Sequence, residues 1–477
     1  MASSSSEADQ NPSIPMEAKK LHIAMFPWLA FGHIIPFLDL SKFLASKGHK
    51  ITFISTPRNI DRLPKISPEF ASSITLLKLP LPKIDDGLPP NAEATMDISN
   101  DNIPYLKKAY DGLEPDLTNF LENSLPDWII HDFSSFWLPP IAAKLGISKA
   151  FFSIINAWFI VNMGSSETML KGIDPRTKPE DFTVPPKWVP FETKVAYKLY
   201  ESHWIIGSTN QNISGVSDTY RTGVSVEGTD AIFIRHCNEF EGQWWKLLED
   251  LHNKPVIPLG LMPPEANNSG ENWGSIKGWL DNQKKGSVVY VALGSEVSLN
   301  ETQIKELALG LELCGIPFLW ALRKPENLPD EFEERVEATG KGIVWKKWAP
   351  QLKILSHESV GGFLTHCGWS SCIEGLMFGH PLIMLPFVVD QGLNARVLQE
   401  REVGVEVARN ELDGSYTRDS VADSLRMVMV GNEGKRFKEK AKEVSLVFGD
   451  RELHNRYLNE FVKFLEKKRP LIKPVST

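Results

Sequence analysis

The sequence predicts two α/β domains, each organised around a doubly wound parallel sheet. The chain has 477 residues, whereas a single hydrophobic core stops growing at roughly 250 to 300 residues. Short continuous apolar runs alternate with segments of helical spacing, which is typical of strands buried on both faces of a parallel sheet. Residues 251–272 are dense in Pro, Gly and Asn, so we expect a linker between the domains there.

The first domain is expected over residues 21–250. The preceding residues 1–20 are polar and contain no apolar run long enough for a signal peptide, so we expect a disordered lead-in. The segments "LHIAMFP", "GHIIPFLDLSKFLASKG" and "HKITFIST" then predict a strand, a helix and a strand. The alternation continues through "DWIIHDF", "PPIAAKLGI" and "SKAFFSI".

The second domain is expected over residues 273–450. Its strands are predicted from "SVVYVALGS", "PFLWALR", "GIVWKKW", "VGGFLTH", "HPLIMLPF" and "VGVEV", and a helix from "ETQIKELALGLELCG". No run of about 18 apolar residues occurs, so we expect no stable membrane insertion. The formal net charge of −8 argues against a nucleic-acid partner. Four cysteines without disulfide or zinc spacing indicate a reducing compartment, and we expect a cytoplasmic protein.

Functional residues should follow the apolar runs, because doubly wound sheets bind ligands at the carboxyl ends of their strands. His33 follows the first run at the start of a helix, where the helix dipole disfavours an imidazolium. A neutral ring could accept a proton if Asp132, at the end of "DWIIHD", fixed its tautomer. Two other interpretations stay open: a packing or capping role for His33 and a helix N-cap for Asp132.

The second domain contains a predicted anion site. The segment "THCGWSSCIEG" runs from a strand into a helix whose N-terminal N–H groups and hydroxyls can converge on a diphosphate. Glu374, one turn into this helix, could bond a ribose, although a surface Glu is an equally good interpretation. Trp348 could offer a flat face to a base, although a lone Trp is more often a core residue. The residues expected to hold the anion are Ser295, His366, Gly368, Trp369, Ser370 and Ser371.

The 44 residues from Trp348 to Gln391 resemble the signature box of plant UDP-dependent glycosyltransferases. The segments "FPWLAFGHIIPFLDLSKFLASKGHKITFIST" and "VVYVALGSE" extend the resemblance over almost the whole chain. It implies a GT-B fold, in which two Rossmann-like domains face a cleft, with the nucleotide sugar on the second domain and the acceptor on the first. It also implies that the final helix, within residues 451–477, packs back on the first domain.

The resemblance assigns a role to each matching position. It places the uracil on Trp348 and the ribose on Glu374, and it places the transferred sugar on Asp390 and Gln391, a combination that with Trp369 implies glucose. The usual Asn is replaced by Ser370, which shortens or removes one amide contact. The further positions expected to bind the donor are Ser295, Ala349, Gln351, His366, Gly368 and Ser371.

The resemblance implies an inverting transfer in which His33 deprotonates the acceptor hydroxyl and Asp132 supports the imidazolium. No cofactor is expected, because UDP-glucose is a co-substrate, and no metal is expected, because the sequence has no Asp-x-Asp pair. The chain is expected to act as a monomer. A nicotinamide-dependent oxidoreductase and a serine hydrolase are disfavoured, since G-x-G-x-x-G after the first strand and G-x-S-x-G anywhere are lacking.

The acceptor is expected to be a hydrophobic small molecule. Aromatic residues flank both catalytic candidates, although core packing is the alternative for each of them. Segments such as "PPNAEATMDI" resemble a subgroup that adds a sugar to one already attached to a terpenoid or flavonoid. Rhamnose, xylose or galactose donors, an aglycone acceptor and a non-catalytic sugar-nucleotide-binding protein stay open. The aromatic residues expected at the acceptor are Trp28, Phe31, Phe136 and Trp137.

Overall fold

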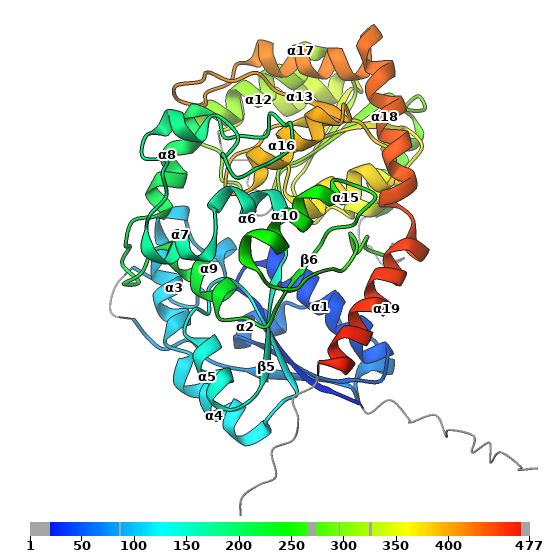
Figure 1. Cartoon of the computed structure of the whole chain (residues 1–477). Coiled ribbons are helices and arrows are strands. Elements are labelled where there is room, and N and C mark those ends of the chain that lie inside the picture. Colours follow the sequence, from blue (N-terminus) through cyan, green and yellow to red (C-terminus); the bar gives the residue numbers. More distant parts are fainter. Residues whose placement is uncertain (1–19, 85–86, 266–272, 295, 324–326, 469–477) are drawn as a thin grey trace, which may run out of the picture.

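The structure contains two parallel sheets, one in each half of the chain (Figure 1). It is a computed structural model that describes residues 20–84, 87–265, 273–294, 296–323 and 327–468. The expected lead-in, apart from Lys20, therefore lies outside the described residues, as do Ser295 and the segment 469–477.

The first sheet has the strand order β3-β2-β1-β4-β5-β6-β7, and all its pairs are parallel. The order reverses between β1 and β4, which creates a crevice at their carboxyl ends. Its strands are β1 (His22–Phe26), β2 (Lys50–Ser55), β3 (Ile74–Lys78), β4 (Trp128–His131), β5 (Ser148–Ser153), β6 (Ala231–Ile234) and β7 (Val256–Pro258).

The second sheet has the order β10-β9-β8-β11-β12-β13 and is also parallel throughout. Its order reverses between β8 and β11, so a second crevice forms there. The strands are β8 (Val288–Ala292), β9 (Phe318–Ala321), β10 (Gly342–Trp345), β11 (Val360–Thr365), β12 (Leu382–Met384) and β13 (Gly404–Glu406). The prediction of two doubly wound domains is confirmed.

Helices cover the faces of both sheets (Figure 1). In the first lobe they are α1 (Phe31–Ser46), α2 (Pro57–Asp61), α3 (Ile103–Asp111), α4 (Glu114–Ser124), α5 (Leu138–Lys144), α6 (Ala157–Met163), α7 (Ser166–Lys171), α8 (Leu199–Ser208), α9 (Asp218–Glu227) and α10 (Gly242–His252), with 3-10 turns η1 (Pro68–Phe70), η2 (Thr95–Asp97), η3 (Asn100–Asn102) and η4 (Pro179–Phe182). After the first sheet follow α11 (Trp273–Asp281), α12 (Glu301–Cys314), α13 (Phe332–Ala338), α14 (Gln351–Leu355), α15 (Trp369–Met377), α16 (Gln391–Glu400), α17 (Arg418–Met429), α18 (Asn432–Phe448) and α19 (Arg451–Lys467).

The structure differs from the expected linker at its start. Within residues 251–272, α10 ends at His252 and β7 pairs with β6 at the edge of the first sheet. The high proline content of this segment argued against a strand. Proline is tolerated here because Pro258 ends an edge strand, where no backbone N–H is needed for a further neighbour. The first lobe therefore extends to Pro258, and part of the remaining connection, residues 266–272, lies outside the described residues.

The last helix, α19, packs on the first lobe, beside α1 in Figure 1. Its buried residues Leu458, Phe461, Val462 and Leu465 have the 3, 4 and 7 spacing of one helical face. They join the core that contains the first-sheet strands, and Trp128 donates its indole N–H to the carbonyl of Leu465 at 3.2 Å.

The two lobes share a hydrophobic core. One cluster of buried side chains includes Phe151 and Ile232 from the first sheet together with Tyr290 and Phe363 from the second. Burial of apolar area across this contact contributes roughly 25 cal/mol for each Å² removed from water. The two lobes are therefore packed directly against each other.

Candidate active site

His33 and Asp132 form a hydrogen-bonded pair at the crevice of the first sheet. His33 is the third residue of α1, which follows β1, and Asp132 follows the adjacent strand β4. The imidazole Nδ1 lies 2.7 Å from Asp132 Oδ2. Asp132 also accepts the backbone N–H groups of Trp28 at 3.1 Å and of Phe133 at 2.8 Å. These three donors fix the carboxylate, which in turn fixes the imidazole.

The electrostatics of His33 differ from the expectation of a lowered proton affinity at a helix N-terminus. Burial does oppose the imidazolium, but the charge and hydrogen bond of Asp132 outweigh it and hold the pKa of His33 above the ordinary histidine value. The charges of Glu296 and Asp390 act in the same direction. His33 is therefore a stronger base than a free histidine, with Nδ1 engaged and Nε2 as the nitrogen that can take a proton.

Asp390 approaches this pair from the second lobe. It precedes α16 and is buried, with 8% of its surface exposed. Burial raises the pKa of Asp390 to about 6, although a hydrogen bond from Asn394 and the nearby His33 oppose the rise. Because the charges of the two side chains influence each other, Asp390 of the second lobe lies close to the His33–Asp132 pair of the first.

His366 lies at the crevice of the second sheet, between two glycines. A Cβ at Gly294 or at Gly368 would come within 2.6 Å of His366 Nε2, and Gly294 has φ +74°. Glycine is therefore required at position 294 both for its backbone conformation and for its approach to the ring. Burial lowers the pKa of His366 to about 4, so the imidazole is neutral, and its Nδ1 has no partner among the described residues.

The helix α15 starts beside this ring, with Gly368 as its N-cap. No acidic residue occupies its first turn, so its N-terminal N–H groups are not neutralised by a carboxylate of their own. Ser371 lies half-buried in this turn. The arrangement fits an anion such as a diphosphate, as the sequence predicts.

Arg235, which the sequence analysis missed, contacts Ser370 in the first turn of α15. It follows β6 of the first lobe and donates from Nη1 to Ser370 Oγ at 2.8 Å and from Nη2 to the carbonyl of Leu261 at 3.0 Å. Burial lowers the pKa of Arg235 to about 10, while Asp39 and Glu374 oppose this. The strand-end rule that selected His33 applies equally to "AIFIR" and could have found this cation.

The side chain of Trp369 is buried in the contact between the lobes. It is 4% exposed, its indole N–H donates to the carbonyl of Arg235 at 3.1 Å, and its ring packs edge-on against Trp158. The indole donor is therefore used in the contact between the lobes, and a role of Trp369 in sugar selection stays a prediction.

Trp348, Gln351 and Glu374 are the residues predicted to bind the nucleoside, and the structure brings the last two into contact. Trp348 follows β10 and is 76% exposed, which rules out a core role. Gln351 donates to Glu374 Oε2 at 2.6 Å and accepts from Tyr290 at 3.2 Å. Burial raises the pKa of Glu374, against the effects of Gln351 and Arg235. Ala349, which follows Trp348 in the sequence, is half-buried. It packs against the core shared by the two lobes.

Gln391, beside Asp390, is oriented by the backbone. Its Oε1 accepts the N–H groups of Phe387 at 2.9 Å and Val388 at 3.1 Å. Because the oxygen is engaged twice, the amide nitrogen is the part of this side chain that can donate to a ligand hydroxyl.

The aromatic residues near His33 divide into core and cleft positions. Trp28 and Trp137 are 3% and 8% exposed and belong to the core around Tyr110, which favours the alternative of core packing; their contact with the acceptor stays a prediction. Phe31 and Phe136 are half-buried. Phe133, which the sequence analysis did not select, is also half-buried, and its ring centroid lies 5.9 Å from that of His33.

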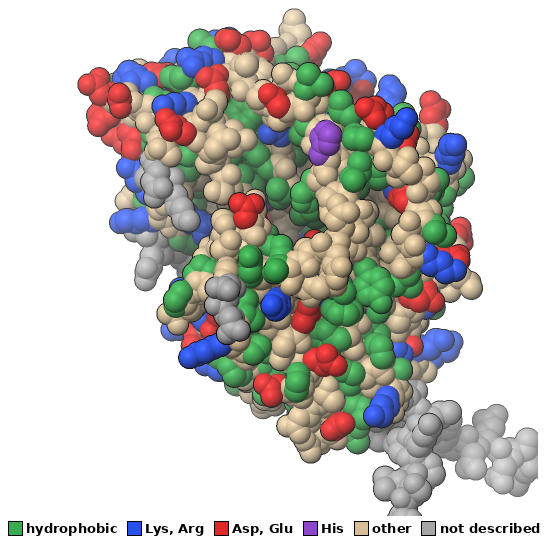
Figure 2. Space-filling view, turned by 90° about the vertical axis from the view of Figure 1, so that its left-hand side faces the viewer, with side chains coloured by type: hydrophobic (Ala, Val, Ile, Leu, Met, Phe, Trp, Pro, Cys, Tyr) green, Lys and Arg blue, Asp and Glu red, His purple; other side chains and the backbone are tan. Residues whose placement is uncertain are grey.

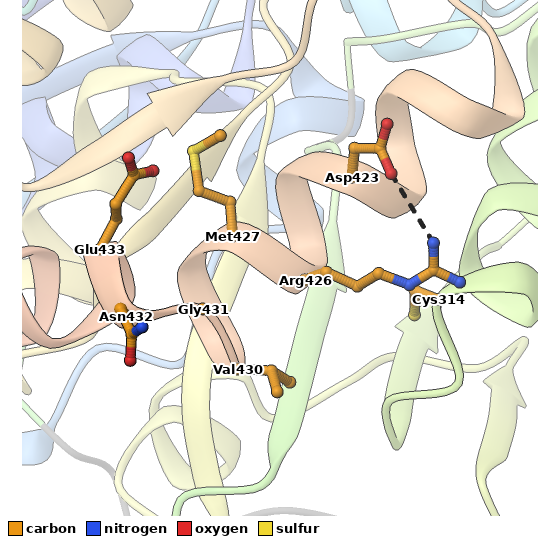
Figure 3. A pocket seen from close by; sticks show the side chains of 8 residues that line it. All are labelled: Cys314, Asp423, Arg426, Met427, Val430, Gly431, Asn432 and Glu433. Atoms are coloured by element: carbon orange, nitrogen blue, oxygen red, sulfur yellow. Dashed lines mark ion pairs between the residues drawn. The ribbon is translucent and has the colours of Figure 1, made fainter.

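Outside the candidate site, the described surface shows no feature that points to another ligand. Figure 3 shows a hollow between α12, α17 and α18, where Asp423 and Arg426 form an ion pair at 3.6 Å; none of the predicted site residues lines it. On the face shown in Figure 2, acidic and basic side chains are interspersed, and no extended basic area forms. Among the described residues, no group of three or more His, Cys, Asp or Glu side chains is placed to hold a metal.

Comparison with known proteins decides the family. UDP-glycosyltransferase 91D2 from Stevia rebaudiana is 52% identical over 466 residues, which cover 95% of this chain and 97% of the relative. This chain belongs to the UDP-glycosyltransferase family. Residues 275–462 of this UDP-glycosyltransferase also match the family described as UDP-glucoronosyl and UDP-glucosyl transferase. The predicted enzyme class and the resemblance to plant members are confirmed.

Two further comparisons extend this result. Soyasaponin III rhamnosyltransferase from Glycine max is 42% identical over 467 residues, covering 94% of this UDP-glycosyltransferase and 96% of the relative. The crystal structure of Glycyrrhiza uralensis UGT73P12 with glycyrrhetinic acid 3-O-monoglucuronide superposes with a TM-score of 0.77 at 23% identity, covering 94% and 96% of the two chains. The GT-B fold is thereby confirmed. None of the helices in the described part of the enzyme combines the length and apolar character needed to cross a bilayer.

Proposed function

We propose that this enzyme transfers glucose from UDP-glucose, with inversion, to a sugar hydroxyl of a terpenoid or flavonoid glycoside. The observation that carries the proposal is the hydrogen-bonded His33–Asp132 pair, with Asp390 of the other lobe near enough to interact with His33 electrostatically. A protein that only binds sugar nucleotides has no need of a base held by a buried carboxylate.

In the proposed reaction, Nε2 of His33 takes the proton of the acceptor hydroxyl. The oxygen attacks the anomeric carbon on the face opposite UDP, and the bond from that carbon to the diphosphate oxygen breaks through an oxocarbenium-like transition state. The electron pair leaves with the diphosphate, so an α-linked donor gives a β-linked product. Asp132 stabilises the imidazolium that forms.

The leaving group gains negative charge as it departs. The free N–H groups of α15 and His366 lie at the proposed diphosphate site, with the buried cation of Arg235 beside the first turn. Preorganised donors of this kind contribute about 3 kcal/mol each when aimed at developing charge. We therefore propose that transfer needs neither a metal ion nor a cofactor.

The glycoside acceptor is supported by relatedness. The soybean relative is named for the transfer of rhamnose to soyasaponin III, a saponin and therefore itself a glycoside. Phe133 and Phe31, half-buried near His33, suit the hydrophobic part of such an acceptor. The same relative makes rhamnose the principal alternative donor.

The proposal is tested with an equimolar mixture of UDP-glucose, UDP-rhamnose, UDP-xylose and UDP-galactose. Terpenoid and flavonoid glycosides and their aglycones serve as acceptors, with and without EDTA. We expect β-linked glucose on glycosides and no effect of EDTA. Products from aglycones alone would reject the acceptor class, transfer of rhamnose, xylose or galactose instead of glucose would reject the donor, and binding of UDP without transfer from any donor would reject catalysis.

Replacing Trp348 with Ala is expected to weaken UDP binding about tenfold, since stacking of an aromatic ring on a base contributes about 1–3 kcal/mol. Stability should change by less than about 0.5 kcal/mol, because the side chain is 76% exposed. Calorimetric titration with UDP and thermal unfolding measure the two quantities. Trp204→Ala, at an exposed tryptophan of α8, is the control and should leave UDP binding unchanged. Equal affinities for UDP in all three proteins would exclude the stacking role.

A further inference from the structure

Asn394 stands at the centre of a buried hydrogen-bond network that crosses between the lobes. Its Oδ1 accepts from Asn156 Nδ2 at 2.9 Å and from the indole N–H of Trp158 at 2.8 Å. Its Nδ2 donates to Asp390 Oδ2 at 2.7 Å and to the carbonyl of Cys367 at 2.9 Å. Asn394, Asn156 and Trp158 are fully buried.

The partners of Asn394 agree on which way its amide points. An indole N–H can only donate, so the atom facing Trp158 must be the amide oxygen. The amide nitrogen then faces Asp390, which can accept in its ionised form. The reverse orientation would set an N–H against the indole N–H and an oxygen against the carboxylate. The carbonyl of Cys367, which can only accept, requires the same orientation, so the donors of the first lobe reinforce the hydrogen bond to Asp390.

The two halves of the network are placed by different lobes. Asn156 is the N-cap of α6 and Trp158 lies in its first turn, after β5 of the first sheet. Asn394 lies in α16, one turn after Asp390, in the second lobe. The ring of Trp158 also packs edge-on against Trp369, with centroids 5.2 Å apart and an interplanar angle of 88°. Contact between the lobes thus sets both the position and the direction of the indole.

We propose that Asn394 is a positioning residue that makes recognition of the transferred sugar by Asp390 depend on the contact between the two lobes. This inference rests on the proposed function, in which Asp390 bonds the sugar hydroxyls. Without the donors from the first lobe, the buried oxygen of Asn394 has no partner among the described residues, and only Cys367 and Asp390 hold its amide in place. UDP without a sugar does not engage Asp390, so its binding is insensitive to this network.

The test is Trp158→Phe, which keeps an aromatic ring and removes the indole N–H. We expect kcat/KM for the nucleotide sugar to fall about tenfold. This is the size of effect expected when Asn394, which bonds the charged Asp390, loses one of the hydrogen bonds that orient it. The Kd for UDP and the KM for the acceptor should stay within about twofold. Asn156→Ala removes the other donor and should have the same selective effect.

Trp320→Phe is the matched control. Trp320 is a fully buried tryptophan of β9, and its indole nitrogen has no hydrogen-bond partner among the described residues. The substitution removes the same atoms from a core without removing a hydrogen bond, so donor kinetics should match the wild type. Donor kinetics impaired equally in Trp320→Phe and Trp158→Phe would overturn the proposal, because general loosening of the core would then suffice.

A double-mutant cycle with Asp390→Asn tests the route through the carboxylate. If Trp158 acts through Asn394 on Asp390, Trp158→Phe should cost less than about twofold in the Asp390→Asn background. A full tenfold loss in that background, or equal losses of UDP and nucleotide-sugar affinity, would overturn the inference while leaving the proposed function intact. Absence of transfer by the wild type would instead overturn the proposed function.

Discussion

His33→Ala is expected to lower kcat by about 10²- to 10⁴-fold, the range that a positioned general base contributes. The acceptor hydroxyl then has no group to take its proton, whereas the donor site in the second lobe is unchanged. The Kd for UDP should therefore stay within about twofold. Initial rates at saturating donor and acceptor, together with calorimetric titration of UDP, measure the two effects separately.

His357→Ala is the control for this substitution. His357 forms a comparable pair with Asp281, its Nε2 lying 3.1 Å from Oδ1, but Asp281 is half exposed and the pair lies outside the cleft. Loss of this pair should leave kcat unchanged within about twofold. Turnover retained by His33→Ala would contradict the role of His33 as the base, and a parallel loss of UDP binding would show that the variant is misfolded.

Asp132→Asn is expected to lower kcat about a hundredfold or more, because the imidazolium loses its partner. The substitution also disturbs the geometry. Asp132 accepts hydrogen bonds on both oxygens, so an amide nitrogen must face either the N–H of Phe133 or the donors from Trp28 and His33. The imidazole then loses part of the restraint that keeps Nε2 directed at the acceptor.

The pH dependence of kcat gives a second, independent result. The base works only when neutral, so activity is lost as pH falls through the pKa of His33. Since Asp132 holds that pKa above the ordinary value, the acid limb of the wild type should lie above about pH 6.5. In Asp132→Asn, burial still lowers the pKa and the opposing charge is gone, so the limb should move to lower pH.

Asp390, whose pKa is about 6, titrates in a neighbouring range and affects donor binding. Measuring kcat at saturating donor separates the two groups. An acid limb that stays in place in Asp132→Asn would show that His33 is not the group that titrates.

Features within one lobe were accessible from the sequence. The pairing of His33 with Asp132 follows from the rule that β1 and β4 are neighbours where the strand order reverses, so residues after both strands must meet. The anion site at Gly368 follows from a strand that runs directly into a helix. Local patterning carries this information because parallel strands end at a common edge of the sheet.

The positions of aromatic residues were less accessible from the sequence. Trp28 and Trp137 neighbour the catalytic pair in sequence but point into the core, whereas Phe133 lies half-buried next to His33. An aromatic ring has the same apolar character in a core and in a cleft. Whether the ring lies in the core or in the cleft depends on its packing against helices such as α3. No local sequence pattern specifies that packing.

The sequence by itself determined the two doubly wound sheets, the pairing of His33 with Asp132, and a helix start without an acidic residue in its first turn. The tertiary structure alone decided what joins the lobes: Arg235 against Ser370, and Trp158 and Asn156 against Asn394. The two contacts to Asn394 span 238 and 236 residues of sequence. Such contacts arise only when two separately folded cores are buried against each other, so no periodicity or spacing within either half can encode them.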